Sequence, residues 1–140
     1  MPETETKETL ARFVEWTKIK IRFHIEKGNR YFYEGEIWWA SLGANIGYEQ
    51  DGKNAQFERP VLIVRRFNRY MFWGLPITSK VRDDFYHYQF ENAAGSKNAV
   101  HLTQLRLFSC NRLLRKIGPF PKDKFREVKD KICDLIQNGL

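Results

Sequence analysis

The chain has 140 residues, a length that fits one domain with its own core and leaves little room for two. Hydrophobic residues make up 42% of the sequence, which excludes a disordered chain, and no apolar run is long enough to cross a membrane. The net charge is +7, and residues 101–131 alone hold nine Lys and Arg against three Asp and Glu. Such a chain attracts polyanions, so we expect a nucleic acid or an acidic protein as partner, with a merely solvated basic surface as the alternative.

The first residues, MPETETKETL, are acidic and polar and lack the pattern of a secretory signal, so we expect a cytoplasmic protein. In that reducing compartment Cys110 and Cys133 are expected to be free core residues, with a disulfide as the less favoured interpretation.

The N-terminal segment predicts a helix. Its apolar positions share one helical face: Leu10, Phe13, Val14 and Thr17. Residues 19–25 alternate in a way that also suits a strand, but we favour one helix that ends near Lys27, with Gly28 as its stop.

Short strands are predicted over residues 36–42, 61–64, 71–77, 86–90 and 99–107, with a further strand starting within 108–114. Residues 43–58 are rich in Gly and Asn and predict a long loop of the kind that carries function. The last element is a helix that follows Pro121 and has one apolar face: Phe125, Val128, Ile132, Leu135 and Ile136. This order predicts an α+β fold on a small antiparallel barrel or strongly bent sheet.

Two polar residues mark the ends of a predicted hairpin. Arg59 precedes the run 61–64 and Thr78 follows the run 71–77, so antiparallel pairing would bring both to the same end of the sheet. A guanidinium matches phosphate oxygens, and a hydroxyl can donate to them. The alternatives are an arginine paired to a carboxylate and a threonine bonded to its own backbone.

Several segments in one order resemble the MazF/PemK toxin family over about residues 33–138. They are GEIWWASLG (35–43), GYEQ (47–50), RPVLIV (59–64), PITS (76–79) and LTQLRL (102–107). The resemblance implies an SH3-like small β-barrel domain over residues 33–140 that ends in the C-terminal amphipathic helix, after an extra N-terminal helical extension over residues 1–32.

The resemblance also implies an activity. Members of the family are sequence-preferring endoribonucleases that need no metal or other cofactor, and each is neutralised by a cognate antitoxin. They cleave single-stranded RNA by attack of the 2′-hydroxyl, which leaves a 2′,3′-cyclic phosphate and a 5′-hydroxyl. A homodimer is the usual assembly.

Site residues follow by matching positions. The resemblance implies that Arg59, Thr78 and Glu49 are catalytic and that Ser79, Gln104 and Arg106 contact RNA. The basic and aromatic turn that holds Arg65, Arg66 and Arg69 could grip RNA, and a hairpin tip kept soluble by charge is an equal alternative.

Two features depart from the family pattern. The loop between Gln50 and Arg59 is longer than usual, which bears on the RNA sequence preference. The segment before Tyr33 is extra, which bears on the antitoxin contact and the oligomer.

Three rival hypotheses stay open. Histidines could supply an acid–base pair, from among His24, His87 and His101. A divalent metal could bind to Asp83, Asp84 and His87. Alternatively, the chain is a non-catalytic module that acts through protein contacts, as gyrase-inhibiting toxins of similar fold do, and Arg59 and Thr78 would then be dispensable.

Overall fold

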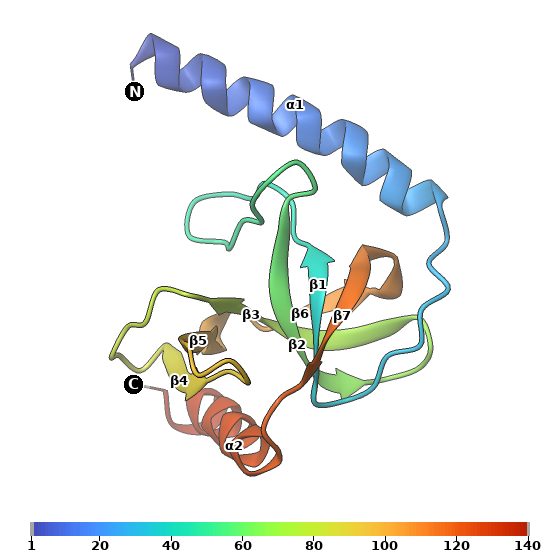
Figure 1. Cartoon of the computed structure of the whole chain (residues 1–140). Coiled ribbons are helices and arrows are strands. Elements are labelled where there is room, and N and C mark those ends of the chain that lie inside the picture. The colour runs from blue at the N-terminus through green and yellow to red at the C-terminus, as the bar shows by residue number, and fades with distance from the viewer. Residues whose placement is uncertain (1, 140) are drawn as a thin grey trace.

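A computed structural model describes residues 2–139 and shows a strongly bent antiparallel sheet with a helix at each end of the chain (Figure 1). The helices are α1 (Glu3–Ile25) and α2 (Lys122–Asn138), with two 3-10 helices, η1 (Leu102–Gln104) and η2 (Cys110–Arg112). The strands are β1 (Glu36–Ser41), β2 (Glu58–Arg66), β3 (Met71–Thr78), β4 (His87–Glu91), β5 (Lys97–His101), β6 (Arg106–Ser109) and β7 (Leu113–Pro119).

The predicted α+β fold class is confirmed, although the barrel is not closed. The strand order is β4-β5-β3-β2-β1-β7, with β6 alongside β3, and among residues 2–139 no pairing joins the two end strands β4 and β7. Within the same residues, no helix combines the length and the apolar character needed to span a membrane.

Strand β2 is buried on both faces because successive side chains point to opposite sides of the sheet. Val61 and Ile63 enter one core cluster with Phe72 and Phe108. The residue between them, Leu62, enters a second cluster that α2 covers. These two clusters fix β2 and its neighbour β3 at the centre of the molecule.

The single strand predicted over residues 99–107 is wrong, because η1 interrupts it. Strand β3 has to pair with two strands on one side: its end, Ile77 and Thr78, pairs with β5, and its start, Met71 to Gly74, pairs with β6. The chain turns a corner at η1 to pass from one pairing to the other, and Leu102 is buried there.

Helix α1 is confirmed as one helix, and the alternative strand over residues 19–25 is wrong. The helix ends at Ile25 with Glu26 as its cap, so the predicted stop at Gly28 is wrong. The apolar residues of segment 19–25 fit both the helical and the strand period. In the helix, Ile19 and Phe23 pack beside the buried Trp16, while Ile21 and Ile25 remain exposed. Figure 1 shows α1 standing apart from the sheet, above the loop that joins β1 to β2.

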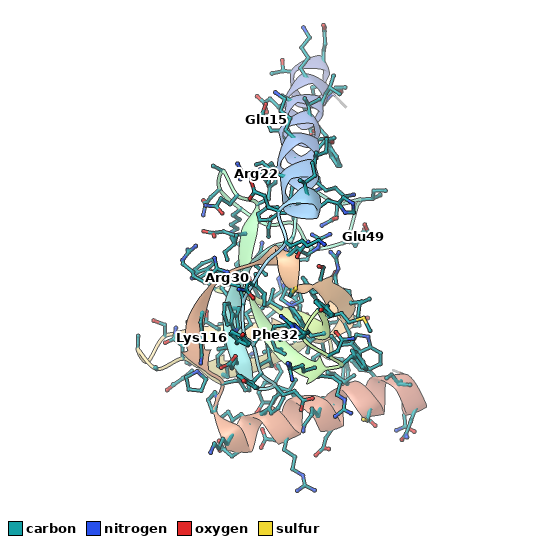
Figure 2. All side chains as sticks on the ribbon, turned by 90° about the vertical axis from the view of Figure 1, so that its right-hand side faces the viewer. Glu15, Arg22, Arg30, Phe32, Glu49 and Lys116 are labelled. Atoms are coloured by element: carbon teal, nitrogen blue, oxygen red, sulfur yellow. The ribbon has the colours of Figure 1, made fainter. Side chains whose placement is uncertain are left out.

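Helix α2 is confirmed, with Val128 and Ile132 buried against the second core cluster. The Tyr88 hydroxyl of β4 donates a hydrogen bond to Glu127 of α2. Figure 2 shows α1 and α2 at opposite ends of the molecule with the sheet between them.

Both cysteines are free; Cys110 is buried as predicted, but Cys133 is exposed, so its assignment to the core is wrong.

Candidate active site

A pocket of about 270 Å³ lies where β2 begins and β3 ends. The β2–β3 register begins at the pair of Val61 and Pro76, and Arg59 and Thr78 each lie two residues beyond that pair on their own strand. Both side chains line the pocket, as the antiparallel hairpin predicts. The complete lining is Gln50, Lys53, Arg59, Thr78, Lys80, Arg82, His87 and His101.

The Arg59 guanidinium is half-buried. Its Nε donates a 2.6 Å hydrogen bond to the backbone oxygen of Asp51. Burial lowers the pKa of Arg59, and the charge of Asp51 works in the opposite direction. Among the described residues no carboxylate lies within ion-pair distance of this guanidinium, so the alternative of a structural ion pair is wrong.

The preceding residue, Glu58, is the carboxylate that does form an ion pair. It is buried, and its two oxygens accept hydrogen bonds of 2.9 and 3.2 Å from Arg115. This bidentate pair across the sheet anchors the start of β2 and leaves the Arg59 side chain directed to the pocket.

Thr78 is buried at the end of β3, and its Oγ1 accepts a 3.1 Å hydrogen bond from the backbone N–H of Lys80. The backbone bond foreseen as an alternative therefore exists. Because the hydroxyl is the acceptor in that bond, its proton remains available for a ligand oxygen. The adjacent Ser79 is exposed and does not line the pocket.

Glu49, Gln104 and Arg106 line a second pocket, of about 370 Å³, which shares Gln50 with the first. Exposed Glu49 accepts a 3.1 Å hydrogen bond from the N–H of Ile46. Burial lowers the pKa of Arg106, and the charge of Glu49 opposes that shift. The two pockets meet at Gln50, a residue of the β1–β2 loop that lines both of them.

The Gln104 amide holds this loop in place. Its Oε1 accepts from the N–H of Gln50 at 3.1 Å, and its Nε2 donates to the backbone oxygen of Tyr48 at 2.9 Å. Both ends of the amide are thus engaged within the protein.

The structure does not bring the predicted hairpin arginines to these pockets. Arg65 lies six residues after Arg59 on β2, roughly 20 Å along an extended strand. It faces Glu34, 3.5 Å away, and Arg66 lies over the ring of Phe32. Arg69 packs over its neighbour Tyr70 at the hairpin tip, and Figure 1 shows this tip at the far end of β2 and β3.

Sequence reasoning missed three cations of the pocket: Lys53, Lys80 and Arg82. Lys80 and Arg82 follow Thr78 closely, and the alternation Thr-Ser-Lys-Val-Arg was the available signal. Of the three histidines that could supply an acid–base pair, His87 and His101 both line this pocket.

The proposed metal ligands do not converge. Only Asp84 of the two aspartates contacts His87, through a 2.6 Å hydrogen bond to Nδ1. Within residues 2–139, no group of three histidine, cysteine or carboxylate side chains is arranged to hold a metal ion.

The fold and the matched residues define a class of protein. Residues 33–136 match the family model described as "PemK-like, MazF-like toxin of type II toxin-antitoxin system". This match spans most of the chain, so the chain belongs to the PemK/MazF toxin family. Helix α1 precedes the matched residues.

Solved structures of similar fold include MazF from Deinococcus radiodurans, at 19% identity and a TM-score of 0.60 over 76% of this chain and 98% of that one. The Mycobacterium tuberculosis toxin MazF-mt6 is 20% identical, with a TM-score of 0.56 over 72% of this chain and 95% of its own. A mycobacterial endoribonuclease in complex with its cognate antitoxin is 12% identical, with a TM-score of 0.59 over 77% and 97%. At these identities the likeness supports the fold. No curated protein sequence matches the chain.

Proposed function

We propose that this chain is a toxin endoribonuclease that cleaves single-stranded RNA without a metal ion and is neutralised by a cognate antitoxin. The observation that carries the proposal is the meeting of Arg59 and Thr78 in one basic pocket of a chain that belongs to the PemK/MazF family. No carboxylate pairs with that guanidinium among the described residues, so it is available to a phosphate.

The reaction requires charge stabilisation more than covalent help from the protein. The RNA 2′-oxygen attacks the phosphorus, the bond from phosphorus to the 5′-oxygen breaks, and negative charge grows on the non-bridging oxygens in between. Arg59 faces that charge with a fixed fork of donors, and the Thr78 hydroxyl donates a hydrogen bond to one of these oxygens. Lys80 and Arg82 raise the local concentration of the RNA backbone.

The second pocket continues the path of the RNA. Arg106 is suited to hold a neighbouring phosphate or to stack on a base, and Glu49 lies beside it. Ser79 sits next to Thr78 on the surface, within reach of the backbone on that side. Gln104 acts by holding the loop above both pockets.

The partner assignments belong to the same proposal. The similar mycobacterial endoribonuclease is in complex with its cognate antitoxin, and a structure of MazE-MazF from Deinococcus radiodurans has a TM-score of 0.57 to this chain. We assign an acidic antitoxin segment to the pocket of Arg59, Lys80 and Arg82, where it would exclude RNA. A homodimer completes the proposed assembly.

The test is cleavage of a long single-stranded RNA in the presence of chelator, under single-turnover conditions with saturating protein. Arg59→Ala should slow cleavage by about 10²–10³-fold, because one well-placed donor contributes roughly 3–4 kcal/mol to the transition state. Thr78→Val keeps the shape of the buried side chain and removes the hydroxyl, so we expect a loss of at least tenfold. Arg126→Ala, an exposed arginine on α2, is the matched control and should cleave like the wild type.

A folded wild-type protein that cuts no RNA would contradict the proposal and favour the non-catalytic module. Cleavage that stops in chelator and returns with a divalent ion would contradict the metal-free mechanism. Normal rates in both Arg59→Ala and Thr78→Val would remove these residues from the active site.

A further inference from the structure

Two histidines share the pocket with Arg59 and Thr78. His87 begins β4 and His101 ends β5, and the antiparallel register places them directly opposite each other. Their ring centroids are 4.4 Å apart, with an angle of 60° between the planes. Both line the pocket, so a phosphate held by Arg59 would lie beside this pair.

Asp84 orients the His87 ring through a hydrogen bond. Its Nδ1 lies 2.6 Å from Asp84 Oδ1, and only 8% of its side chain is exposed. This hydrogen bond lowers the pKa of Asp84, so the carboxylate is ionised at neutral pH and accepts the Nδ1 hydrogen of His87. The other nitrogen, Nε2, is buried without a hydrogen-bond partner in the described residues.

His101 is kept neutral by its surroundings. Burial first, and then the charges of His87, Arg59 and Arg82, lower its pKa to about 4, while the charge of Asp84 acts in the opposite direction. Lys53 and Lys80 are the other cations of the pocket. A neutral imidazole has a free electron pair and can accept a proton at pH 7.

A bound phosphate would strengthen this base. Its negative charge would offset Arg59 and Arg82, which together depress the proton affinity of His101 in the empty pocket. A general base works best when its pKa is near the working pH, and the substrate itself would move His101 in that direction.

We propose that His101 is the catalytic base that takes the proton of the RNA 2′-hydroxyl, and that His87, oriented by Asp84, is a positioning residue for the His101 ring. The inference rests on the proposed ribonuclease function and assigns its proton transfer. The bond between the 2′-oxygen and phosphorus forms as the proton moves to an imidazole nitrogen of His101. The bond to the 5′-oxygen breaks, that oxygen takes a proton from water, and the resulting hydroxide takes the proton back from His101.

The experiment compares wild type, His101→Gln and a control, His24→Gln, which changes an exposed histidine on α1. Single-turnover rates are measured with cleavable RNA, and affinity with an RNA that carries 2′-deoxyribose at the cleaved position. His101→Gln should lower the rate by about 10²–10⁴-fold, the usual contribution of general acid–base catalysis, with affinity within threefold of wild type. Added imidazole should restore part of the lost rate in this variant and leave Arg59→Ala unchanged.

The His87 role has its own readout. The charge of His87 lowers the pKa of His101, so replacing His87 with Gln should raise the pKa of His101. The single-turnover rate, plotted against pH, should then begin to fall at a higher pH than in the wild type. A His87→Gln variant that cleaves more slowly but loses activity at the same acidic pH as the wild type would show a purely structural role for His87 and overturn the positioning assignment.

Cleavage that depends on Arg59 but proceeds within threefold of wild type in His101→Gln would overturn the proton-transfer assignment and leave the ribonuclease proposal standing. A loss of affinity in His101→Gln equal to the loss of rate would also overturn it, since His101 would then be a binding residue. Absence of cleavage by folded wild type would remove both proposals together.

Discussion

At the scale of residues, the candidate site depends on two strand pairings, that of β2 with β3 and that of β3 with β5. Arg59 and Thr78 belong to one hairpin, so antiparallel pairing is enough to bring them together. His101 reaches them only because β5 pairs with the end of β3, a contact between segments more than twenty residues apart. No local pattern in the sequence signals that pairing.

His101 also gives the protein a pH dependence of stability. Its pKa is about 4 in the folded state against an ordinary value of 6.5. Between these values the unfolded chain binds a proton that the folded chain does not, so the free energy of unfolding should fall as the pH is lowered through this window. Since the pocket is open to solvent, we expect the effect to be well below the full linkage value.

Urea unfolding of wild type and His101→Gln at several values between pH 7 and pH 4.5 measures this contribution. As the pH falls through this window, the free energy of unfolding of the wild type should decrease more steeply than that of His101→Gln, because only the wild type carries the His101 penalty. His24→Gln is the control and should keep the wild-type slope. Parallel curves for wild type and His101→Gln would show that His101 titrates alike in the folded and unfolded chains.

At the scale of elements, the N-terminal helix contacts the β1–β2 loop, which in turn contacts the candidate active site. The Trp16 ring packs against Gly43, where a Cβ atom would sit 2.2 Å from it and where φ is +88°. Arg12 Nη2 donates to the backbone oxygen of Gly52 at 2.6 Å. The residue before Gly52, Asp51, accepts the hydrogen bond from Arg59, so α1 is coupled to the candidate catalytic arginine through one short segment.

This coupling could not be predicted from the sequence. Residues 19–25 satisfy a helical and a strand period together, and the surface that receives Trp16 is a loop rich in glycine and polar residues. Its shape depends on backbone conformation, as at Gly43, which no hydrophobic pattern records.

Removing the Trp16 side chain should therefore reduce activity as well as stability. We expect Trp16→Ala to increase amide hydrogen exchange in residues 43–57 and to slow RNA cleavage by about tenfold, because Arg59 loses a fixed partner. Phe13→Ala, on the same helix but 37% exposed, is the matched control. Unchanged exchange in the loop of a folded Trp16→Ala protein would contradict the coupling.

At the scale of the whole molecule, positive charge gathers at two places on the β2–β3 hairpin. The pocket holds Arg59, Lys80 and Arg82 at one end, and Arg65 and Arg69 lie at the other. In the pocket, Arg59 makes no ion pair among the described residues. At the tip, Arg65 faces Glu34 and Arg69 packs on Tyr70. We therefore expect the pocket end to dominate RNA binding and the tip to contribute little.

Salt dependence of binding separates the two ends, because each phosphate contact to single-stranded RNA adds about −0.7 to the slope of log affinity against log salt. Replacing Lys80 and Arg82 with Gln should make the slope shallower by about 1.4, measured with a 2′-deoxy-blocked RNA. The pair Lys7→Gln and Lys18→Gln removes the same charge from α1, where both lysines pair with glutamates, and should leave the slope unchanged. Replacing Arg65 and Arg69 tests the tip directly. If replacing Arg65 and Arg69 makes the slope shallower by as much as replacing Lys80 and Arg82, RNA runs the length of the hairpin. An antitoxin would then have to cover both ends of the hairpin to neutralise the protein.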